Sequence, residues 1–358
     1  MSEGSAVIDR RTVSIDGRDA VAPVDEEELA LLLDHASNQG MRVAIRGGGT
    51  HRDIGYPVEA DLTISTAALG GIFDWKPDDL TVVVGAGTPV VDLESELAGQ
   101  RQSAVLPEQP GRATVGGIVA TGTSAYRRLR YGPTRDRMLE VHAVTGDGRR
   151  IKGGGRVVKN VSGYDLPRLF TGSLGSLGVI TSVCFKLWPR AETSATVHLS
   201  DPERVGAVYR PLAVLEDRGG MRVLLEGTGS EVEDQVRRLG GETEPGLTYP
   251  EALSTPAVWS VRVRPSLLGE ALGRLPDGSE FIAQHRVGEV SFGVENDFDP
   301  SGIREWAESS GGRVVRIRGR GEVDPWGSPP AGLDLQRRVV AAFDPRRILE
   351  SGRLPGGV

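Results

Sequence analysis

The amino-acid sequence predicts an α+β protein built from two domains, and three observations support this. The 358 residues are enough for two hydrophobic cores. Short β-branched runs alternate with amphipathic helical patterns along the chain. The glycines form doublets and triplets between strand-like runs up to Ile180, whereas beyond it they lie at the ends of amphipathic segments, as expected of helix caps and turns.

Composition and charge exclude several classes of protein. The 49 glycines follow no Gly-X-Y period, and 38% hydrophobic residues exclude a disordered chain. The formal charge of −7 argues against broad nucleic-acid binding. The single cysteine, Cys184, excludes a disulfide framework and a four-cysteine iron–sulfur site. Because neither a membrane-length apolar run nor a signal peptide is recognisable, we expect a cytoplasmic protein without a transmembrane segment.

The first half predicts helices and a series of short strands. A helix is expected from Asp25 to Gly40, because acidic residues occupy its first turn and a glycine follows it. The section Leu106–Thr134 is predicted to be irregular, and so long a loop within a domain is usually functional. Strands are predicted at Arg42–Ile45, Leu62–Ser65, Ile72–Trp75, Thr81–Val84, Leu139–Val144 and Val179–Leu187, and further helices at Val90–Leu97 and Leu166–Phe170.

After a crossing at Ala191–Ser194, the second half predicts a smaller α+β domain. Its alternation of patterns is typical of an antiparallel sheet with helices on one face. Strands are expected at Ala195–Leu199, Met221–Glu226, Val258–Val263, Glu289–Val294 and Val314–Ile317. Helices are expected at Pro202–Leu215, Glu231–Leu239, Ser266–Leu272, Gly302–Ser309 and Leu333–Phe343.

The first glycine cluster, Arg46-Gly47-Gly48-Gly49-Thr50, directly follows a predicted strand. Three consecutive glycines allow positive φ angles, expose successive backbone N–H groups and let an anion approach the main chain. The pattern is neither a Walker loop nor a G-x-G-x-x-G fingerprint. Considered alone, these five residues fit a plain turn equally well.

Two further clusters follow. Residues 113–124 are almost entirely Gly, Ala, Thr and Ser, which suits close backbone contact with a large flat ligand. A flexible linker is the alternative, but the interleaved Val and Ile disfavour it. In the third cluster, which extends to Ile180, Lys159, Tyr164 and Asp165 can orient a substrate. Alternatively, Asp165 caps the next helix and Tyr164 packs beneath it.

In this order and spacing the clusters resemble the FAD-binding domain of the vanillyl-alcohol oxidase/p-cresol methylhydroxylase (PCMH) family, with greatest likeness to the FAD-binding subunits of bacterial glycolate oxidases. The likeness rests on RVAIRGGGT, VVVGAGTPVVDLESEL, ATVGGIVATGTS and KNVSGYDLPRLFTGSLGSLGVITSV, and resumes with AAFDPRRILESGRLPG. It implies a PCMH-type FAD-binding domain of two subdomains at residues 14–190, a smaller α+β cap domain at 191–330, and a C-terminal segment, 331–358, that returns to the FAD-binding domain.

The resemblance also implies which residues hold FAD. The pyrophosphate loop would consist of Arg46, Gly47, Gly48, Gly49, Thr50 and His51. The diphosphate and ribityl chain would be lined by Thr114, Val115, Gly116, Gly117, Ala120, Thr121, Gly122 and Thr123, with Pro107 on the approach to them. Main-chain groups of Gly178, Val179 and Ile180 would contact the adenine side or the flavin ring.

The chain departs from the family pattern at three places. Covalent members often carry a histidine where this chain has Thr50, so we expect FAD to be bound non-covalently. The H-x-G-D-G-N-x-x-H segment of related 2-hydroxy-acid dehydrogenases is missing, and the five histidines are widely spaced, so no metal is assigned. The family's C-terminal Asn-Pro-Gly is replaced by Glu350-Ser351-Gly352.

An arginine cluster follows the second glycine cluster. It can receive a substrate carboxylate, the FAD phosphates or a partner subunit, or it forms a solvated basic face. Cys184 lies in an apolar strand and is expected to be buried. The cluster consists of Arg127, Arg128, Arg130, Arg135 and Arg137.

By resemblance, the expected function is that of an FAD-dependent oxidoreductase subunit acting on a small 2-hydroxy acid such as glycolate. The flavin would pass electrons to O₂, a quinone or a partner protein. The setting would be a complex with a larger flavoprotein and an iron–sulfur subunit, which can lie at the membrane periphery. Tyr164 and Lys159 are the candidate catalytic side chains. The alternatives are a stand-alone FAD oxidase of an alcohol or alditol, and a non-catalytic FAD-binding subunit.

Overall fold

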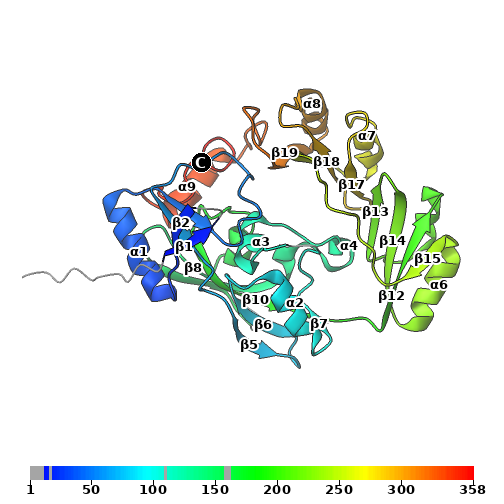
Figure 1. Ribbon diagram of the computed structural model, residues 1–358, viewed down its shortest axis with the longest axis horizontal. Coiled ribbons are helices and arrows are strands. Elements are labelled where there is room, and N and C mark those ends of the chain that lie inside the picture. Colours follow the sequence, from blue (N-terminus) through cyan, green and yellow to red (C-terminus); the bar gives the residue numbers. More distant parts are fainter. Residues whose placement is uncertain (1–11, 16–17, 109–110, 157–162) are drawn as a thin grey trace, which may run out of the picture.

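The computed structural model describes residues 12–15, 18–108, 111–156 and 163–358. Lys159 therefore lies outside the described residues. The chain folds into a first domain with two main sheets and a second domain with one large antiparallel sheet (Figure 1). The predicted α+β fold is confirmed.

A mixed sheet of the first domain positions the first glycine cluster. Its strands lie in the order β1 (Thr12–Ile15), β2 (Arg18–Val21), β4 (Leu62–Ser65) and β3 (Val43–Arg46), and the last three run parallel. Helix α1 (Glu26–Gln39) covers this sheet with buried leucines. It begins at Asp25, whose carboxylate accepts two backbone N–H groups, and ends at Gly40, whose φ is +65°.

The second sheet of the first domain is antiparallel and supports the other two clusters. It packs against α2 (Val90–Ala98), α3 (Val115–Thr121) and α5 (Leu166–Phe170). A short pair, β7 (Gln102–Ser103) with β11 (Trp188–Pro189), closes the crossing to the second domain. The strand order is β5 (Ile72–Lys76), β6 (Thr81–Gly85), β10 (Val179–Lys186), β8 (Met138–Val144) and β9 (Arg150–Gly154).

Helices α3 and α4 (Arg128–Tyr131) lie within the section predicted to be irregular, so that prediction is wrong for these residues. Thr114 caps α3, because its hydroxyl accepts a hydrogen bond from the Gly117 N–H at 3.3 Å. The apolar side chains of α3 are buried against β6 and β10. Burial of that face stabilises a helix whose glycines disfavour it locally.

The second domain contains an antiparallel sheet, as predicted, but with eight strands instead of the five expected. Helices α6 (Gly229–Leu239), α7 (Leu268–Leu272) and α8 (Ser301–Ser309) cover one face, and the other face is turned toward α4 (Figure 1). The strand order is β15 (Glu242–Pro245), β12 (Thr193–Leu199), β14 (Gly220–Gly227), β13 (Ala213–Asp217), β17 (Phe281–Gln284), β18 (Glu289–Val294), β16 (Ala257–Arg262) and β19 (Arg313–Arg318). The three additional strands, β13, β15 and β17, were not predicted from the sequence.

The helix predicted over Pro202–Leu215 is wrong. A 3₁₀ turn, Pro202–Ala207, is followed by strand β13. Pro211 cannot donate a backbone hydrogen bond within a helix, and Arg210 has a φ of +50°. The apolar run after Pro211 instead pairs with β14 through a tight hairpin and is buried.

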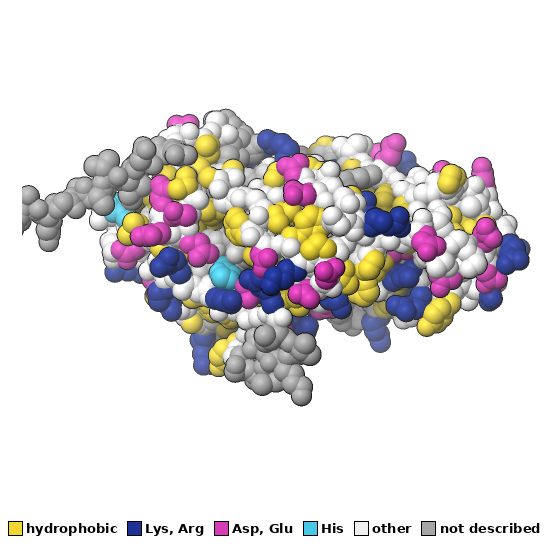
Figure 2. Space-filling model, turned by 90° about the horizontal axis from the view of Figure 1, so that it is seen from below, with side chains coloured by type: hydrophobic (Ala, Val, Ile, Leu, Met, Phe, Trp, Pro, Cys, Tyr) yellow, Lys and Arg dark blue, Asp and Glu magenta, His cyan; other side chains and the backbone are white. Residues whose placement is uncertain are grey.

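The C-terminal residues return to the first domain. Helix α9 (Leu333–Phe343) packs on its core, where Phe343 meets Phe170 edge-on with ring centroids 5.7 Å apart. Leu349 then forms a parallel bridge with Val43 of β3. On the face seen from below, acidic and basic side chains are intermixed rather than gathered into a basic stripe (Figure 2). Among the described helices, none is both long and apolar enough to cross a membrane.

Candidate functional site

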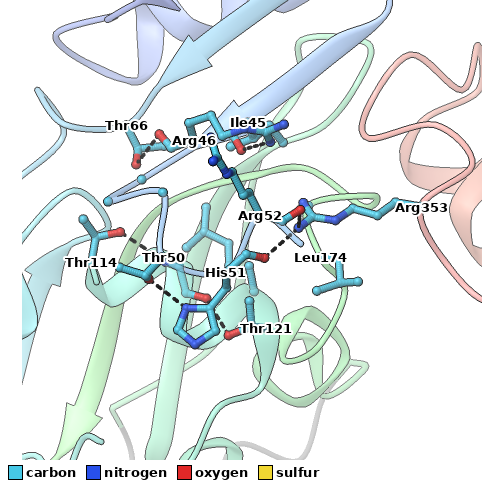
Figure 3. A pocket seen from close by; sticks show the side chains of 18 of the residues that line it. Ile45, Arg46, Thr50, His51, Arg52, Thr66, Thr114, Thr121, Leu174 and Arg353 are labelled. Carbon is cyan, nitrogen blue, oxygen red and sulfur yellow. Dashed lines mark hydrogen bonds between the residues drawn. The ribbon is translucent and has the colours of Figure 1, made fainter. Parts of the chain in front are cut away.

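A narrow groove of about 80 Å³ lies where the three glycine clusters meet (Figure 3). The loop after β3 forms one wall, α3 forms the second, and the turn before β10 forms the third. The C-terminal segment contributes Arg353. The lining residues are Ile45, Arg46, Gly47, Gly48, Gly49, Thr50, His51, Arg52, Thr66, Thr114, Gly116, Gly117, Ala120, Thr121, Leu174, Gly175, Gly178, Ile180 and Arg353.

Most of the residues predicted to hold FAD line this groove, but five do not. Val115 and Val179 are fully buried in the cores on either side of the second sheet. Gly122 ends α3 with a φ of +68°, and the Thr123 hydroxyl hydrogen-bonds that of Thr121 at 2.8 Å. Pro107 lines a different cavity. These five residues therefore lie outside the lining of the groove.

The glycines of the groove serve two distinct purposes. A Cβ on Gly48 would overlap the Arg112 carbonyl oxygen, and one on Gly47 would overlap the Thr114 hydroxyl. These glycines therefore let the loop lie directly against residues 112–114. For a Cβ on Gly117, in contrast, the Thr114 hydroxyl at 3.3 Å is the near neighbour among the described residues. Gly117 therefore leaves room on the groove side.

One buried carboxylate, that of Glu350, binds two of the arginines that line the groove, Arg46 and Arg353. Its Oε1 accepts the Arg46 Nη1–H at 2.8 Å and the Ile45 backbone N–H at 2.6 Å. Its Oε2 accepts from Arg353 at 2.9 Å. With Arg52, whose Nε lies 3.8 Å from Asp53, the groove carries three guanidinium groups against two carboxylates. Among these groups a net positive charge remains.

Glu350 and Arg353 were not predicted as site residues. The available signal was the resumed resemblance at the C-terminus, AAFDPRRILESGRLPG, which contains both. Their distance of some 300 residues from the loop hid their role, because no local pattern links them.

The environment of His51 in the groove favours the uncharged imidazole. Burial, together with the charge of Arg353, lowers its pKa below the ordinary histidine value. Its Nδ1 lies 2.8 Å from the Thr50 hydroxyl, and its backbone carbonyl accepts from Arg353 at 3.0 Å. Figure 3 shows the imidazole beside Thr50 and Thr121.

Of the two predicted catalytic side chains, the described one, Tyr164, does not line the groove. Tyr164 is 90% exposed, so the expectation that it packs beneath the following helix is wrong. Asp165 caps α5 by accepting the Arg168 N–H at 3.1 Å, which confirms that alternative. Lys159 lies outside the described residues.

Two arginines of the cluster, Arg128 and Arg130, link the two domains. Arg128 donates to the buried Glu289 of β18 at 2.8 Å, and Arg130 donates to the Glu226 carbonyl at 2.8 Å. Arg137 is buried among backbone carbonyls, including that of Val105 at 2.8 Å. These contacts contradict both a phosphate-binding cluster and a solvated basic face for these three arginines.

A second, larger cavity of about 720 Å³ lies at the junction of the two domains. Pro107, α2 and the crossing segment form its walls on one side, and Glu226 and Tyr249 lie on the other. The Tyr131 ring contacts that of Trp188 with centroids 5.0 Å apart. In the described part of the chain, no three His, Cys, Asp or Glu side chains are grouped as a metal site would require.

Residues 19–154, which contain the first two glycine clusters, match the FAD binding domain family. These residues of the first domain form an FAD binding domain of that family. This confirms the resemblance drawn from the glycine clusters. The match ends before the third cluster, and the FAD binding domain therefore contributes two of the three walls of the groove.

Three curated relatives are similar to this chain over more than half of its length. Glycolate oxidase subunit GlcE of Escherichia coli K12 is 34% identical over 225 residues, which is 60% of this chain and 64% of that protein. D-lactate dehydrogenase of Archaeoglobus fulgidus is 35% identical over 185 residues, 51% of this chain and 41% of that protein. D-2-hydroxyglutarate dehydrogenase of Xanthomonas citri pv. viticola is 30% identical over 220 residues, which is 57% of this chain and 46% of that protein. The chain thus spans less than two thirds of these relatives.

A solved structure extends the likeness to both domains. Alkyldihydroxyacetonephosphate synthase superposes with a TM-score of 0.64 at 14% identity, over 93% of this chain and 76% of that one. This likeness concerns the fold alone. It shows that a fold similar to that of both domains together occurs in another protein.

Proposed function

We propose that this protein is an FAD-dependent oxidoreductase subunit that acts on a small 2-hydroxy acid such as glycolate. The observation that carries the proposal is the groove, a backbone-lined and net positive channel with two of its three walls formed by the FAD binding domain. A diphosphate needs N–H donors and positive charge at close range. The names of the relatives, which include glycolate oxidase and D-lactate dehydrogenase, support the substrate class.

The residues of the groove fit the diphosphate part of FAD. Gly47 to Thr50 offer consecutive main-chain groups, and Gly117 leaves open the space that a Cβ would fill. Arg46 and Arg353 supply positive charge held at fixed positions. The hydroxyls of Thr50 and Thr121 add polar contacts. When bound, FAD supplies hydride acceptance, while these side chains bind and orient it.

Non-covalent binding of FAD is part of the proposal. Thr50 stands where covalent members often carry a histidine. The Nδ1 of the neighbouring His51 is engaged with the Thr50 hydroxyl at 2.8 Å. Acid precipitation of the purified protein should therefore release the flavin into the supernatant. Flavin that stays with the precipitate would contradict this part of the proposal.

Transfer of electrons to a partner completes the proposal. The single cysteine is buried, so this chain does not provide the ligands of a four-cysteine cluster. We therefore propose a hetero-oligomer with a larger flavoprotein and an iron–sulfur subunit. The name of the GlcE relative, which is itself a subunit, supports this setting.

A non-catalytic FAD-binding subunit is the second candidate. The observation in its favour is that the described side chains lining the groove include arginines and a histidine of lowered pKa but no carboxylate. Tyr164 is exposed to solvent and is not among them. Such a subunit would hold FAD for electron relay while the partner oxidises the substrate.

Anaerobic mixing of the flavin-loaded protein with glycolate, D-lactate and alditols separates these functions. Bleaching of the flavin absorption by a 2-hydroxy acid supports the leading proposal. Bleaching by alditols alone favours a stand-alone oxidase. Flavin that is retained but never bleached favours the non-catalytic subunit. A colourless protein that FAD does not reconstitute would overturn the proposal.

A further inference from the structure

The C-terminal segment places a buried carboxylate directly behind the loop of three glycines. The Val43 N–H donates to the Ile348 carbonyl at 2.7 Å, and the Glu350 N–H donates to the Val43 carbonyl at 2.9 Å. Glu350 is 1% exposed and has a φ of +43°, a backbone conformation uncommon for a residue with a side chain. A glutamate held in this conformation beside β3 points to a need for its side chain.

The Glu350 carboxylate links the two ends of the loop. Through Oε1 it binds the Ile45 N–H and the Arg46 guanidinium, where the loop begins. Through Oε2 it binds Arg353. Arg353 in turn donates to the carbonyls of His51 at 3.0 Å and Ile54 at 2.9 Å, where the loop ends. One carboxylate and one guanidinium thus span the loop from Arg46 to Ile54.

Charge alone does not explain a carboxylate at this position. A negative charge behind an anion-binding loop repels a diphosphate, so its simple electrostatic effect on FAD is unfavourable. Its geometric effect is the opposite, because it fixes the Arg46 guanidinium and, through Arg353, the carbonyls at the end of the loop. The two effects predict opposite outcomes when the charge is removed.

We propose that Glu350 and Arg353 are positioning residues for the diphosphate of the cofactor, acting through the loop from Arg46 to Ile54. This inference rests on the proposed binding of FAD in the groove. Glu350 increases FAD affinity by ordering the loop, and this gain exceeds the repulsion it introduces. Glu350 and Arg353 therefore take part in cofactor binding although they lie outside the matched family domain.

Titration of FAD and of ADP into the apoprotein tests this inference. E350Q keeps the size of the side chain and removes its charge. We expect E350Q to weaken FAD and ADP binding by the same factor, at least tenfold, because both ligands carry the diphosphate. Flavin that remains bound at saturation should keep its absorption spectrum. R346M is the matched control, since Arg346 lies in the same segment but donates to the Ser37 carbonyl of α1.

Unchanged or tighter FAD binding in E350Q would overturn the inference while leaving the proposed function intact. The same holds if R346M weakens FAD binding as much as E350Q, because the effect would then be general destabilisation. If E350Q does not fold, R353K gives the test, since it keeps the charge but not the planar set of donors. Wild-type affinity in folded R353K would overturn the inference, and at least tenfold weaker binding would support it. If wild-type protein binds no FAD, both proposals fall.

Discussion

Gly117 offers the sharpest test of where the diphosphate lies. Replacing it with alanine adds one methyl group on the groove side of α3, with the Thr114 hydroxyl at 3.3 Å as its near neighbour in the described chain. Gly117 lies within a helix, where alanine is favoured over glycine by about 0.5–1 kcal/mol. The Thr114 side chain has to shift by a few tenths of an ångström to accommodate the methyl group, which offsets part of this gain. The fold should therefore tolerate G117A.

The expected loss falls on the cofactor. A diphosphate oxygen that is hydrogen-bonded to a backbone N–H of the groove lies about 2.9 Å from the nitrogen. A methyl group that projects into the groove from residue 117 keeps the diphosphate from approaching the backbone so closely. Losing one hydrogen bond to a charged group costs about 1.5–3 kcal/mol. This corresponds to an FAD dissociation constant raised about 10- to 150-fold.

Fluorescence titration of the apoprotein with FAD, alongside thermal unfolding, measures both quantities. G229A is the matched control, because Gly229 begins α6 and an added Cβ there meets no described atom within 4 Å. G48A should behave differently, since its Cβ overlaps the Arg112 carbonyl oxygen, and should lose about 1–3 kcal/mol of stability together with FAD. A folded G117A with wild-type FAD affinity would refute the assignment of the groove.

Three further predictions concern the contact between the domains, His51 in the groove and the buried Cys184. R128M should lower the free energy of unfolding by about 1–3 kcal/mol, because it leaves the buried Glu289 with fewer donors; an unchanged melting temperature would argue against a link between the domains. Because the pKa of His51 is lower in the folded protein, the unfolded chain binds a proton at this side chain at a higher pH than the folded protein does. The free energy of unfolding should therefore decrease as the pH falls below about 6.5, the ordinary histidine pKa. H51Q should show a smaller slope in thermal unfolding between pH 7 and 5.5, and an equal slope would contradict this. Burial raises the pKa of the Cys184 thiol to about 11, so a thiol reagent should label it in the unfolded chain but not in the native one; rapid native labelling would count against the buried position.

The sequence predicted where the glycine clusters lie, but it did not predict which structural role each glycine has. The clusters lie at the groove as expected, yet Gly48 accommodates the carbonyl of Arg112, 64 residues further along the chain. Gly116 likewise faces Ala86, whose Cβ would lie 2.7 Å from an added Cβ. Such glycines permit two backbone segments to touch. The sequence alone does not distinguish these glycines from Gly117. Their roles differ because a second backbone segment lies against Gly48 and Gly116, whereas Gly117 faces the groove.

Local patterns determined the fold class, the antiparallel second domain and the loop of three glycines, because periodicity and permitted φ angles depend on neighbouring residues. Local patterns also misassigned Pro202–Leu215, where pairing with β14 decided the outcome. The tertiary structure alone decided that Arg128 and Arg130 join the two domains. It also decided that Glu350 and Arg353 support the loop from about 300 residues away. Ion pairs and buried hydrogen bonds depend on proximity in space, which spacing along the chain does not encode.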